Sequence, residues 1–374
     1  MNRIYLDNNA TTALDPRVFK AMLVDLQGPP ANPSSVHWFG TQAKNHLQQA
    51  RSSIASFFQA KPEEITFTSG GTESANLFLR GLGTKGHVIS TKIEHSCVLK
   101  TLQALEKEGL KVTYLPVGPW GAPLSEDLKA AIRSDTIAIA LSAANNETGV
   151  RLDLETFADI AHQHHIPLFI DAVSFIGKEP FPMHPGITAV TLSGHKFHAP
   201  KGVGALFLRS SLKLKAQMTG GEQEYQHRAG TENLAGILGL AKALEIVQKD
   251  QIQISQHLND LRLHLEHGLQ KEIPIVLING EGPRISNTSN LCFPDIDGET
   301  LLIQLDMAGI AVSHGSACAS GALEPSRVLI QMGIPQKMAR SSLRFSLSRM
   351  NTREEIDLVI EKTSQIVQKL SKMK

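Results

Sequence analysis

The chain is poor in cysteine and carries no excess charge of either sign. Only three of its 374 residues are cysteines, Cys97, Cys292 and Cys318, and no pair has the CxxC spacing. This usage excludes a disulfide framework and a cysteine-rich zinc site. The 37 Lys and Arg residues against 36 Asp and Glu residues leave a formal net charge of +1. Bulk charge therefore does not hold the protein on nucleic acid or on a membrane surface.

Long apolar runs and internal repeats are also lacking. No apolar run approaches the roughly 20 residues that a membrane-spanning helix needs. The first residues, MNRIYLDNNATT, do not have the basic and then apolar pattern of a signal peptide. Hydrophobic residues make up 41% of the chain and charged residues 20%, which is enough for a sizeable core. These features predict a soluble cytoplasmic protein, most simply an enzyme.

Short apolar runs alternate with helical patterns through the first two thirds of the chain. Helical patterns cover 42–59 and 72–82. Seven runs have the length and composition of strands: 64–68, 87–91, 111–116, 137–142, 166–171, 188–192 and 203–208. This alternation is typical of βαβ units, so it predicts an α/β fold with a mostly parallel sheet that is covered on both faces.

The pattern changes near residue 234, where a long helical stretch begins. Leucine and isoleucine recur along it at the spacing of one buried stripe, at Ile254, Leu258, Leu261, Leu265 and Leu269. Strand candidates near 290–293 and 310–313 and an amphipathic terminal helix follow. We therefore predict a large domain over 15–250. A smaller α+β domain would combine 1–14 with 251–374, with the boundary inside a helix.

The strongest local signal is Ser193-Gly194-His195-Lys196, directly after a predicted strand. A lysine that reacts with an aldehyde must be held at such a strand end and kept partly unprotonated. Asp171 ends another apolar run, where a buried carboxylate requires a positive partner. The protonated pyridine nitrogen of pyridoxal phosphate would be such a partner. The alternative is that Asp171 only caps the following turn.

The segment ITFTSGGT at 65–72 runs from a predicted strand through a glycine turn into a predicted helix. Free N–H groups and the positive end of the helix dipole then face one point, which suits a bound anion. The hydroxyls of Ser69 and Thr72 would add donors. The segment is neither a GxGxxG nor a Walker A sequence, which argues against nucleotide binding.

Histidines give weaker signals. His95 follows a strand candidate, and a lone histidine there is more often satisfied in a loop or a helix cap. His162, His164 and His165 precede a strand without a carboxylate or cysteine at ligand spacing, so we interpret them as a solvated helix end and expect no metal site.

The surroundings of the cysteines differ. Cys318 lies in the run SHGSACASGA at 313–322, whose small residues predict a loop with an exposed and reactive thiol. Cys292 has the large apolar neighbours Leu291 and Phe293, which are typical of a buried structural cysteine. Cys97 is also expected to be a packing residue.

Taken in order, these segments resemble the cysteine desulfurases, pyridoxal phosphate enzymes of fold type I in the nitrogen-fixation and iron–sulfur-cluster group. The resemblance extends from residue 5 to 344, nearly the whole chain. Its motifs are YLDNNATT at 5–12, NPSSVH at 32–37, SGGTES at 69–74, NNETG at 145–149, SGHKFHAPKGVGAL at 193–206, RAGTEN at 228–233, GSACASG at 315–321 and SLRFSL at 342–347.

The resemblance implies a role for each matched residue. Lys196 would hold pyridoxal phosphate as a Schiff base, Asp171 would pair with its pyridine nitrogen, and His95 would stack on its ring and act as a base. Arg344 would clamp the substrate carboxylate, and Cys318 would be the sulfur acceptor. The further cofactor contacts would be Gly71, Thr72, Asn145 (which would also position the substrate), Ser174, Ser193, His195 and, from the second subunit of a homodimer, Thr231.

The implied activity converts L-cysteine to L-alanine and leaves a persulfide on Cys318, for a sulfur-acceptor protein such as an iron–sulfur cluster scaffold or for tRNA thiolation. Alternatives are a selenocysteine lyase, another class V aminotransferase-like enzyme, which has no use for Cys318, and an inactive regulatory partner. Ser174 departs from the glutamine usual in the family, which removes an expected hydrogen bond to the cofactor. The chain also ends soon after its last helix, so docking of a scaffold through a longer tail is unsupported.

Overall fold

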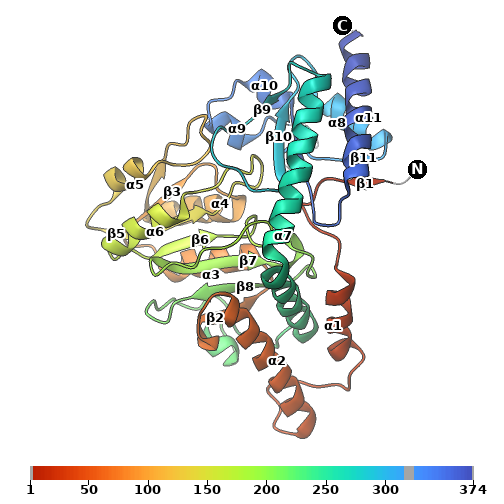
Figure 1. Cartoon of the computed structure of the whole chain (residues 1–374). Coiled ribbons are helices and arrows are strands. Elements are labelled where there is room, and N and C mark those ends of the chain that lie inside the picture. Colours follow the sequence, from red (N-terminus) through yellow and green to blue (C-terminus); the bar gives the residue numbers. More distant parts are fainter. Residues whose placement is uncertain (1–2, 316–323, 373–374) are drawn as a thin grey trace.

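The computed structural model describes residues 3–315 and 324–372 (Figure 1). Its largest sheet has the strand order β2-β8-β7-β6-β5-β3-β4. These strands are β2 (Ile65–Thr68), β3 (His87–Thr91), β4 (Lys111–Leu115), β5 (Thr136–Ser142), β6 (Leu168–Asp171), β7 (Ile187–Ser193) and β8 (Gly204–Leu208). Strands β3 to β7 pair in parallel, and β8 is antiparallel to both β7 and β2. The predicted mostly parallel seven-stranded sheet is confirmed.

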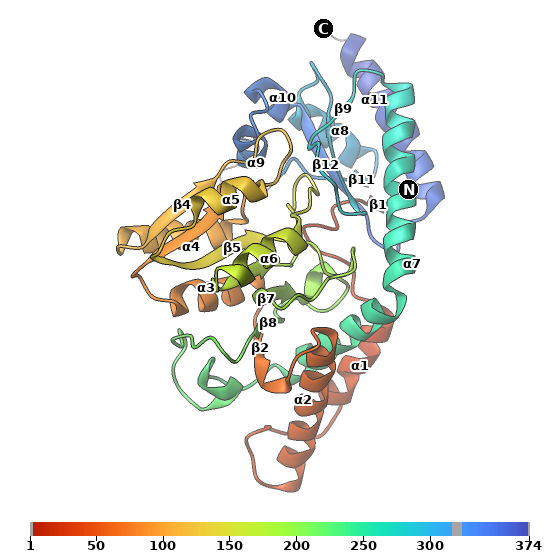
Figure 2. The same cartoon turned by 60° about the vertical axis from the view of Figure 1, so that its left-hand side comes forward.

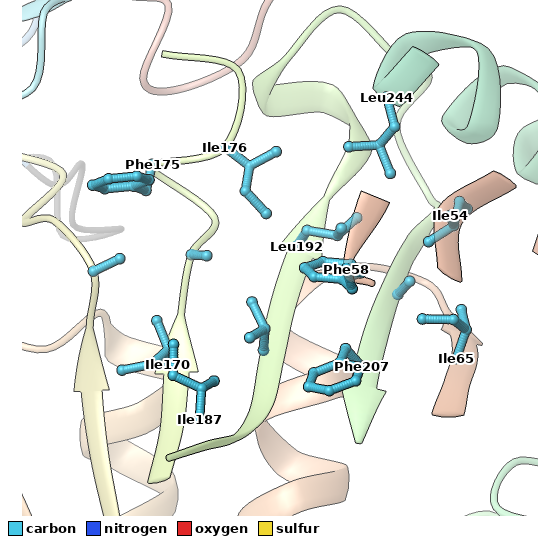
Figure 3. Close-up of a cluster of buried hydrophobic side chains, with 14 of the residues drawn as sticks. Ile54, Phe58, Ile65, Ile170, Phe175, Ile176, Ile187, Leu192, Phe207 and Leu244 are labelled. Atoms are coloured by element: carbon cyan, nitrogen blue, oxygen red, sulfur yellow. The ribbon is translucent and has the colours of Figure 1, made fainter. Parts of the chain in front are cut away.

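Helices cover both faces of this sheet, as the predicted βαβ pattern requires. On one face, α3 (Gly71–Gly81) and α4 (Ser96–Lys107) form a core in which Phe78 stacks on Phe169. The other face carries α2 (Trp38–Phe57), α6 (Leu154–Gln163) and the first half of α7 (Leu234–Glu272). Figure 3 shows this second core, where Phe58 stacks on Phe207 at 5.5 Å between ring centroids. Helices α1 (Pro16–Leu26) and α5 (Ser125–Ala131) each add a buried residue to this second core, Val18 and Leu128.

The start of α2 differs from its prediction. The apolar periodicity predicts a helix over 42–59, whereas α2 begins at Trp38. His37 explains the difference, because its Nδ1 accepts the backbone N–H of Gly40 at 3.2 Å and so caps the helix. Histidine is not among the usual capping residues, so the start was missed.

A second set of elements packs around the far half of α7 (Figures 1 and 2). A three-stranded antiparallel sheet has the order β12-β10-β9, and a short parallel pair joins β1 to β11. The elements are β1 (Ile4–Tyr5), β9 (Leu277–Ile278), β10 (Thr288–Cys292), α8 (Gly298–Met307), β11 (Ile310–Ala311), α9 (Arg327–Gln331), α10 (Gln336–Arg340), β12 (Ser342–Ser346) and α11 (Arg353–Lys372). The N-terminal strand thus pairs with the C-terminal part of the chain.

Helix α7 connects the two cores. Val247 is its last residue in the core of the large sheet, and Ile254 is its first in the second core. We propose that the division between a domain of 15–250 and one of 1–14 with 251–374 lies in this interval. None of the described helices is long and apolar enough to cross a membrane.

Candidate active site

Most of the predicted site residues line one cavity of about 500 Å³. Ser142, Asp171 and Ser193 line it from the carboxyl ends of β5, β6 and β7, which is where α/β sheets bind ligands. The predicted residues that line the cavity are Gly71, Thr72, His95, Asp171, Ser174, Ser193, His195, Lys196 and Arg344. The tertiary structure therefore brings together residues as far apart in the sequence as Gly71 and Arg344.

Lys196 ends the short 3₁₀ turn Gly194–Lys196 that follows β7. Its Nζ donates to the carbonyl oxygens of Asn9 at 2.5 Å and of Ala10 at 2.9 Å. Burial, together with the charge of Arg344, lowers the pKa of Lys196 to about 8, although nearby carboxylates oppose this effect. A sizeable fraction of the amine is therefore neutral near pH 8, as a lysine that bonds to an aldehyde requires.

Asp171 is the last residue of β6 and is buried. Its Oδ1 accepts the backbone N–H of Val173 at 3.0 Å, so the capping interaction considered from the sequence is present. Burial raises the pKa of Asp171, although the interactions of its carboxylate with His95, the backbone N–H of Val173 and Lys196 oppose the rise. A buried carboxylate at a cavity wall is stabilised by a cation, and a protonated pyridine nitrogen is one.

A smaller hollow of about 360 Å³ adjoins the main cavity at the start of α3. Gly70, Gly71 and Thr72 line it together with His195 and Lys201. A Cβ at Gly71 would lie 2.7 Å from Cγ2 of Val173, so only glycine fits there. Gly70 has φ of +149°, which also favours glycine. The helix start with its hydroxyl and basic neighbours forms a cradle that suits the phosphate of pyridoxal phosphate.

Arg344 lies on β12 and is buried. Its Nη2 donates to Oδ1 of Asp7 at 2.6 Å, and its Nη1 donates to the carbonyl oxygen of Asn146 at 3.1 Å. Its Nε is buried and has no hydrogen-bond partner among the described residues. A guanidinium has five N–H donors and these two bonds use two of them, so Arg344 at the cavity wall can also bind a carboxylate.

His95 caps the start of α4, and its Nδ1 accepts the backbone N–H of Cys97 at 3.2 Å. Burial, together with the charge of Lys196, lowers the pKa of the His95 imidazole. Cys97 packs against the α3–α4 core as predicted, but it also lines the cavity, which the sequence did not reveal. Its position two residues after His95 at a helix start was the available signal. Cys292 is buried, as predicted.

Asn145, which the family resemblance places beside the cofactor, does not line the cavity, whereas Asn146 does. The amide nitrogen of Asn145 donates to the carbonyl oxygen of Ile93 at 3.1 Å. Its Oδ1 accepts the backbone N–H groups of Glu147 and Thr148 at 2.9 and 3.1 Å. These bonds close the turn after β5, so the Asn145 side chain is used inside the protein. Asp7 and Asn9, from the DNN of the first motif, also line the cavity and were missed.

Two other predicted residues, Cys318 and Thr231, are not among the residues that line this cavity. Cys318 is outside the described residues, although Ser313 and Gly315, just before that stretch, line the cavity. Thr231 is exposed and does not line the cavity of its own chain. The histidines His162, His164 and His165 are exposed at the end of α6, which confirms the predicted solvated helix end.

The fold and cavity suit an enzyme that binds pyridoxal phosphate, and comparisons with known proteins agree. The family model described as aminotransferase class-V matches residues 4–359. A cysteine desulfurase IscS of Dictyoglomus turgidum is 41% identical over 374 residues, covering 98% of this chain and 95% of the relative. Cysteine desulfurase 2 of Trichormus variabilis is 43% identical over 376 residues, covering 99% of this chain and 94% of the relative.

Solved structures give the same result. A NifS-like protein matches with a TM-score of 0.91 and 35% identity, covering 98% of this chain and all of that one. A NifS-like protein from Rickettsia africae matches with a TM-score of 0.89 and 31% identity over the same shares. The chain therefore belongs to the aminotransferase class-V family and, within it, to the cysteine desulfurases, which are pyridoxal-phosphate-dependent enzymes.

Proposed function

We propose that the chain transfers sulfur from L-cysteine to the thiol of its own Cys318 and releases L-alanine. The Cβ–S bond of the substrate breaks and an S–S bond forms, while one thiol proton moves to the carbon that becomes the methyl group. The reaction balances without an external oxidant or reductant. The observation that carries this proposal is the shared cavity of Lys196, Asp171 and Arg344, which the residues just before Cys318 also line.

The lysine and the aspartate serve the cofactor in this proposal. Bound pyridoxal phosphate supplies an electron sink for the bonds at the substrate α-carbon. Lys196 would hold the cofactor through Nζ, and the same Nζ would take and return the α-proton of the substrate. Its pKa of about 8 supports this exchange, because the neutral and charged forms are close in free energy. Asp171 keeps the ring nitrogen protonated.

The remaining contacts orient the two ligands. Gly71, Thr72, Ser193 and His195 would hold the phosphate in the cradle at the start of α3. Burial, with the charge of Lys196, lowers the pKa of His195 to about 4, so its ring is neutral at pH 7 and acts through hydrogen bonds. Arg344 would bind the substrate carboxylate. His95, Asn146 and Ser174 would contact the cofactor ring or the substrate.

We also propose a homodimer. Val36 is 99% exposed, Trp38 65% and Phe39 45%, so the segment around NPSSVH presents an apolar surface that favours burial by another chain. A second copy is the natural partner, since Thr231 is exposed and free to complete the phosphate cradle of the partner subunit.

The destination of the sulfur and the compartment are further parts of the proposal. The IscS names of the relatives support delivery to an iron–sulfur cluster scaffold, and a tRNA-thiolating protein is the alternative acceptor. Cys97 and Cys292 are free thiols. A protein that works through free thiols suits a reducing compartment, which supports the cytoplasm.

The test compares wild type with Cys318→Ala in the presence of L-cysteine. Wild type is expected to be yellow, to release alanine and to carry a persulfide. The variant should stay yellow and change its spectrum with L-cysteine, but alanine release should fall by several orders of magnitude. Cys292→Ala is the matched control and should keep its activity. Sulfur-35 label on a peptide other than that of Cys318 would overturn the assignment. Release of alanine from selenocysteine alone would favour a selenocysteine lyase.

A further inference from the structure

His95 is both a helix cap and part of the cavity wall. Its Nδ1 accepts the backbone N–H of Cys97, the second residue of α4. A ring nitrogen that accepts a hydrogen bond carries no proton, so the neutral His95 ring must carry its single proton on Nε2. The cap therefore determines the tautomer.

A second group approaches the same ring nitrogen. Sγ of Cys97 lies 3.0 Å from Nδ1 of His95. Because Nδ1 is the acceptor of the backbone N–H, the thiol must be the donor in this contact. A thiolate would instead press a negative charge against the nitrogen lone pair. Burial, with the charges of Asp171 and Glu94, raises the pKa of the Cys97 thiol, so the group keeps the proton that the contact needs.

Packing keeps the thiol in this place. Cys97 is half-buried against the α3–α4 core, and its neighbours Val98 and Leu99 are buried. The backbone N–H and the S–H of one residue thus converge on one nitrogen. Protonation of Nδ1 would require both hydrogen bonds to break, which disfavours the imidazolium form.

We propose that Cys97 is a positioning residue whose S–H group holds His95 neutral, with its proton on Nε2. This inference deepens the proposed function and rests on it only for the effect on turnover. His95 then enters the reaction as a hydrogen-bond donor through Nε2. The two thiols also have separate tasks, because Cys97 must stay protonated whereas Cys318 must attack as a thiolate.

Other charged groups also act on His95, from several elements. Asp171 and Glu147 favour its protonated form, while Lys196 and Arg327 oppose it. Glu94, the preceding residue, is buried. A substitution of Cys97 changes none of these groups and leaves the backbone N–H in place. The difference between Cys97→Ala and Cys97→Ser, which lack and keep the donor, therefore reports the donated hydrogen bond.

The test is nitrogen-15 NMR of histidine-labelled holoenzyme, with the His95 signal assigned through His95→Gln and exposed His164 as the internal reference. Wild-type His95 should be the Nε2–H tautomer and remain neutral at pH 6.5. In Cys97→Ala its pKa should rise by about half to one pH unit, the size expected for one lost hydrogen bond. Cys97→Ser, which keeps a donor, should restore the wild-type value.

A second donor-free variant, Cys97→Val, gives the same reading if Cys97→Ala does not fold. An Nδ1–H tautomer in wild type, or an unchanged pKa in the donor-free variants, would overturn the proposal. The acid limb of kcat/KM should move with the NMR pKa. If the NMR pKa moves and the limb does not, the positioning of His95 stands and its proposed part in turnover fails.

Discussion

The two sides of the cavity are built in different ways. The cofactor side comes from strand ends of one sheet, because Asp171 and Lys196 follow the neighbouring parallel strands β6 and β7. The substrate side joins distant parts of the chain, since Arg344 on β12 pairs with Asp7 near the N-terminus. The comparison teaches that the cofactor side is built mainly from one sheet, to which the N-terminal segment adds the carbonyl oxygens of Asn9 and Ala10 that accept from Lys196. The substrate side exists only when both ends of the chain have assembled.

We expect the largest effect from a substitution on the cofactor side of the cavity. Lys196→Ala removes the amine that bonds to pyridoxal phosphate, and no other described lysine lines the main cavity. The purified variant should therefore lose its visible absorption and all measurable turnover of L-cysteine. Far-UV circular dichroism should stay unchanged, because the lysine side chain lines the cavity and is not part of a hydrophobic core. Turnover near the wild-type rate would contradict the proposed role of Lys196.

A smaller effect should follow from breaking the substrate side. Arg344→Ala removes the proposed carboxylate clamp but leaves the cradle and Lys196, so the variant should stay yellow. We expect kcat/KM for L-cysteine to fall about 100-fold, the size of a lost charge-assisted hydrogen-bond pair, mainly through KM. The variant also leaves Asp7 without its partner, so Asp7→Asn is the control for that loss alone. Loss of cofactor in Arg344→Ala would show that the two sides are not separable.

The reactivity of the Lys196 amine as a function of pH tests the cofactor side of the cavity without a mutation. Lysines ordinarily titrate near 10.4, whereas burial and Arg344 lower the pKa of Lys196 to about 8. The neutral and reactive fraction of the amine grows as pH rises through the pKa. Acetylation of Lys196 in cofactor-free protein should therefore reach its half-maximal rate near pH 8, as measured by peptide mass spectrometry. Exposed Lys129 provides the reference, and the same midpoint at both lysines would refute the effect of the site.

The smallest expected effect concerns Ser174, which lines the cavity on the cofactor side. Ser174→Gln restores the residue usual in the family and with it a side chain long enough for a hydrogen bond to the cofactor. We expect cofactor dissociation to slow a few-fold, in line with one added hydrogen bond. Absorbance during dialysis measures this rate. Faster loss of cofactor would show that the pocket has adapted to the smaller serine.

Local patterns predicted most of the fold and the cofactor side. All seven predicted strands begin and end within two residues of the observed strands. The four strands β5 to β8 in particular are short apolar runs bounded by polar residues. Strand β12 was missed as an element although its Leu343 and Phe345 alternate with polar residues, since Arg344 and two serines make it polar overall. Arg344 was found only through the family resemblance.

The pair Asn145 and Asn146 shows where a sequence motif stops being informative. Both residues belong to the NNETG motif, and nothing in their spacing indicates which side chain faces the ligand. The turn after β5 decides this, because Asn145 closes it by accepting two backbone N–H groups and Asn146 is left at the cavity.

The sequence by itself determined the parallel sheet, the placement of Asp171 and Lys196 at strand ends, and the glycine cradle at the start of α3. These features depend on residues close together in the chain, so periodicity and turn chemistry carry them. Only the tertiary structure decided the pairing of Asp7 with Arg344, the cavity position of Asn146, and the contact of Cys97 with His95. Each of these depends on the direction in which a folded backbone points a side chain, and that direction is set by packing between segments rather than by the order of residues.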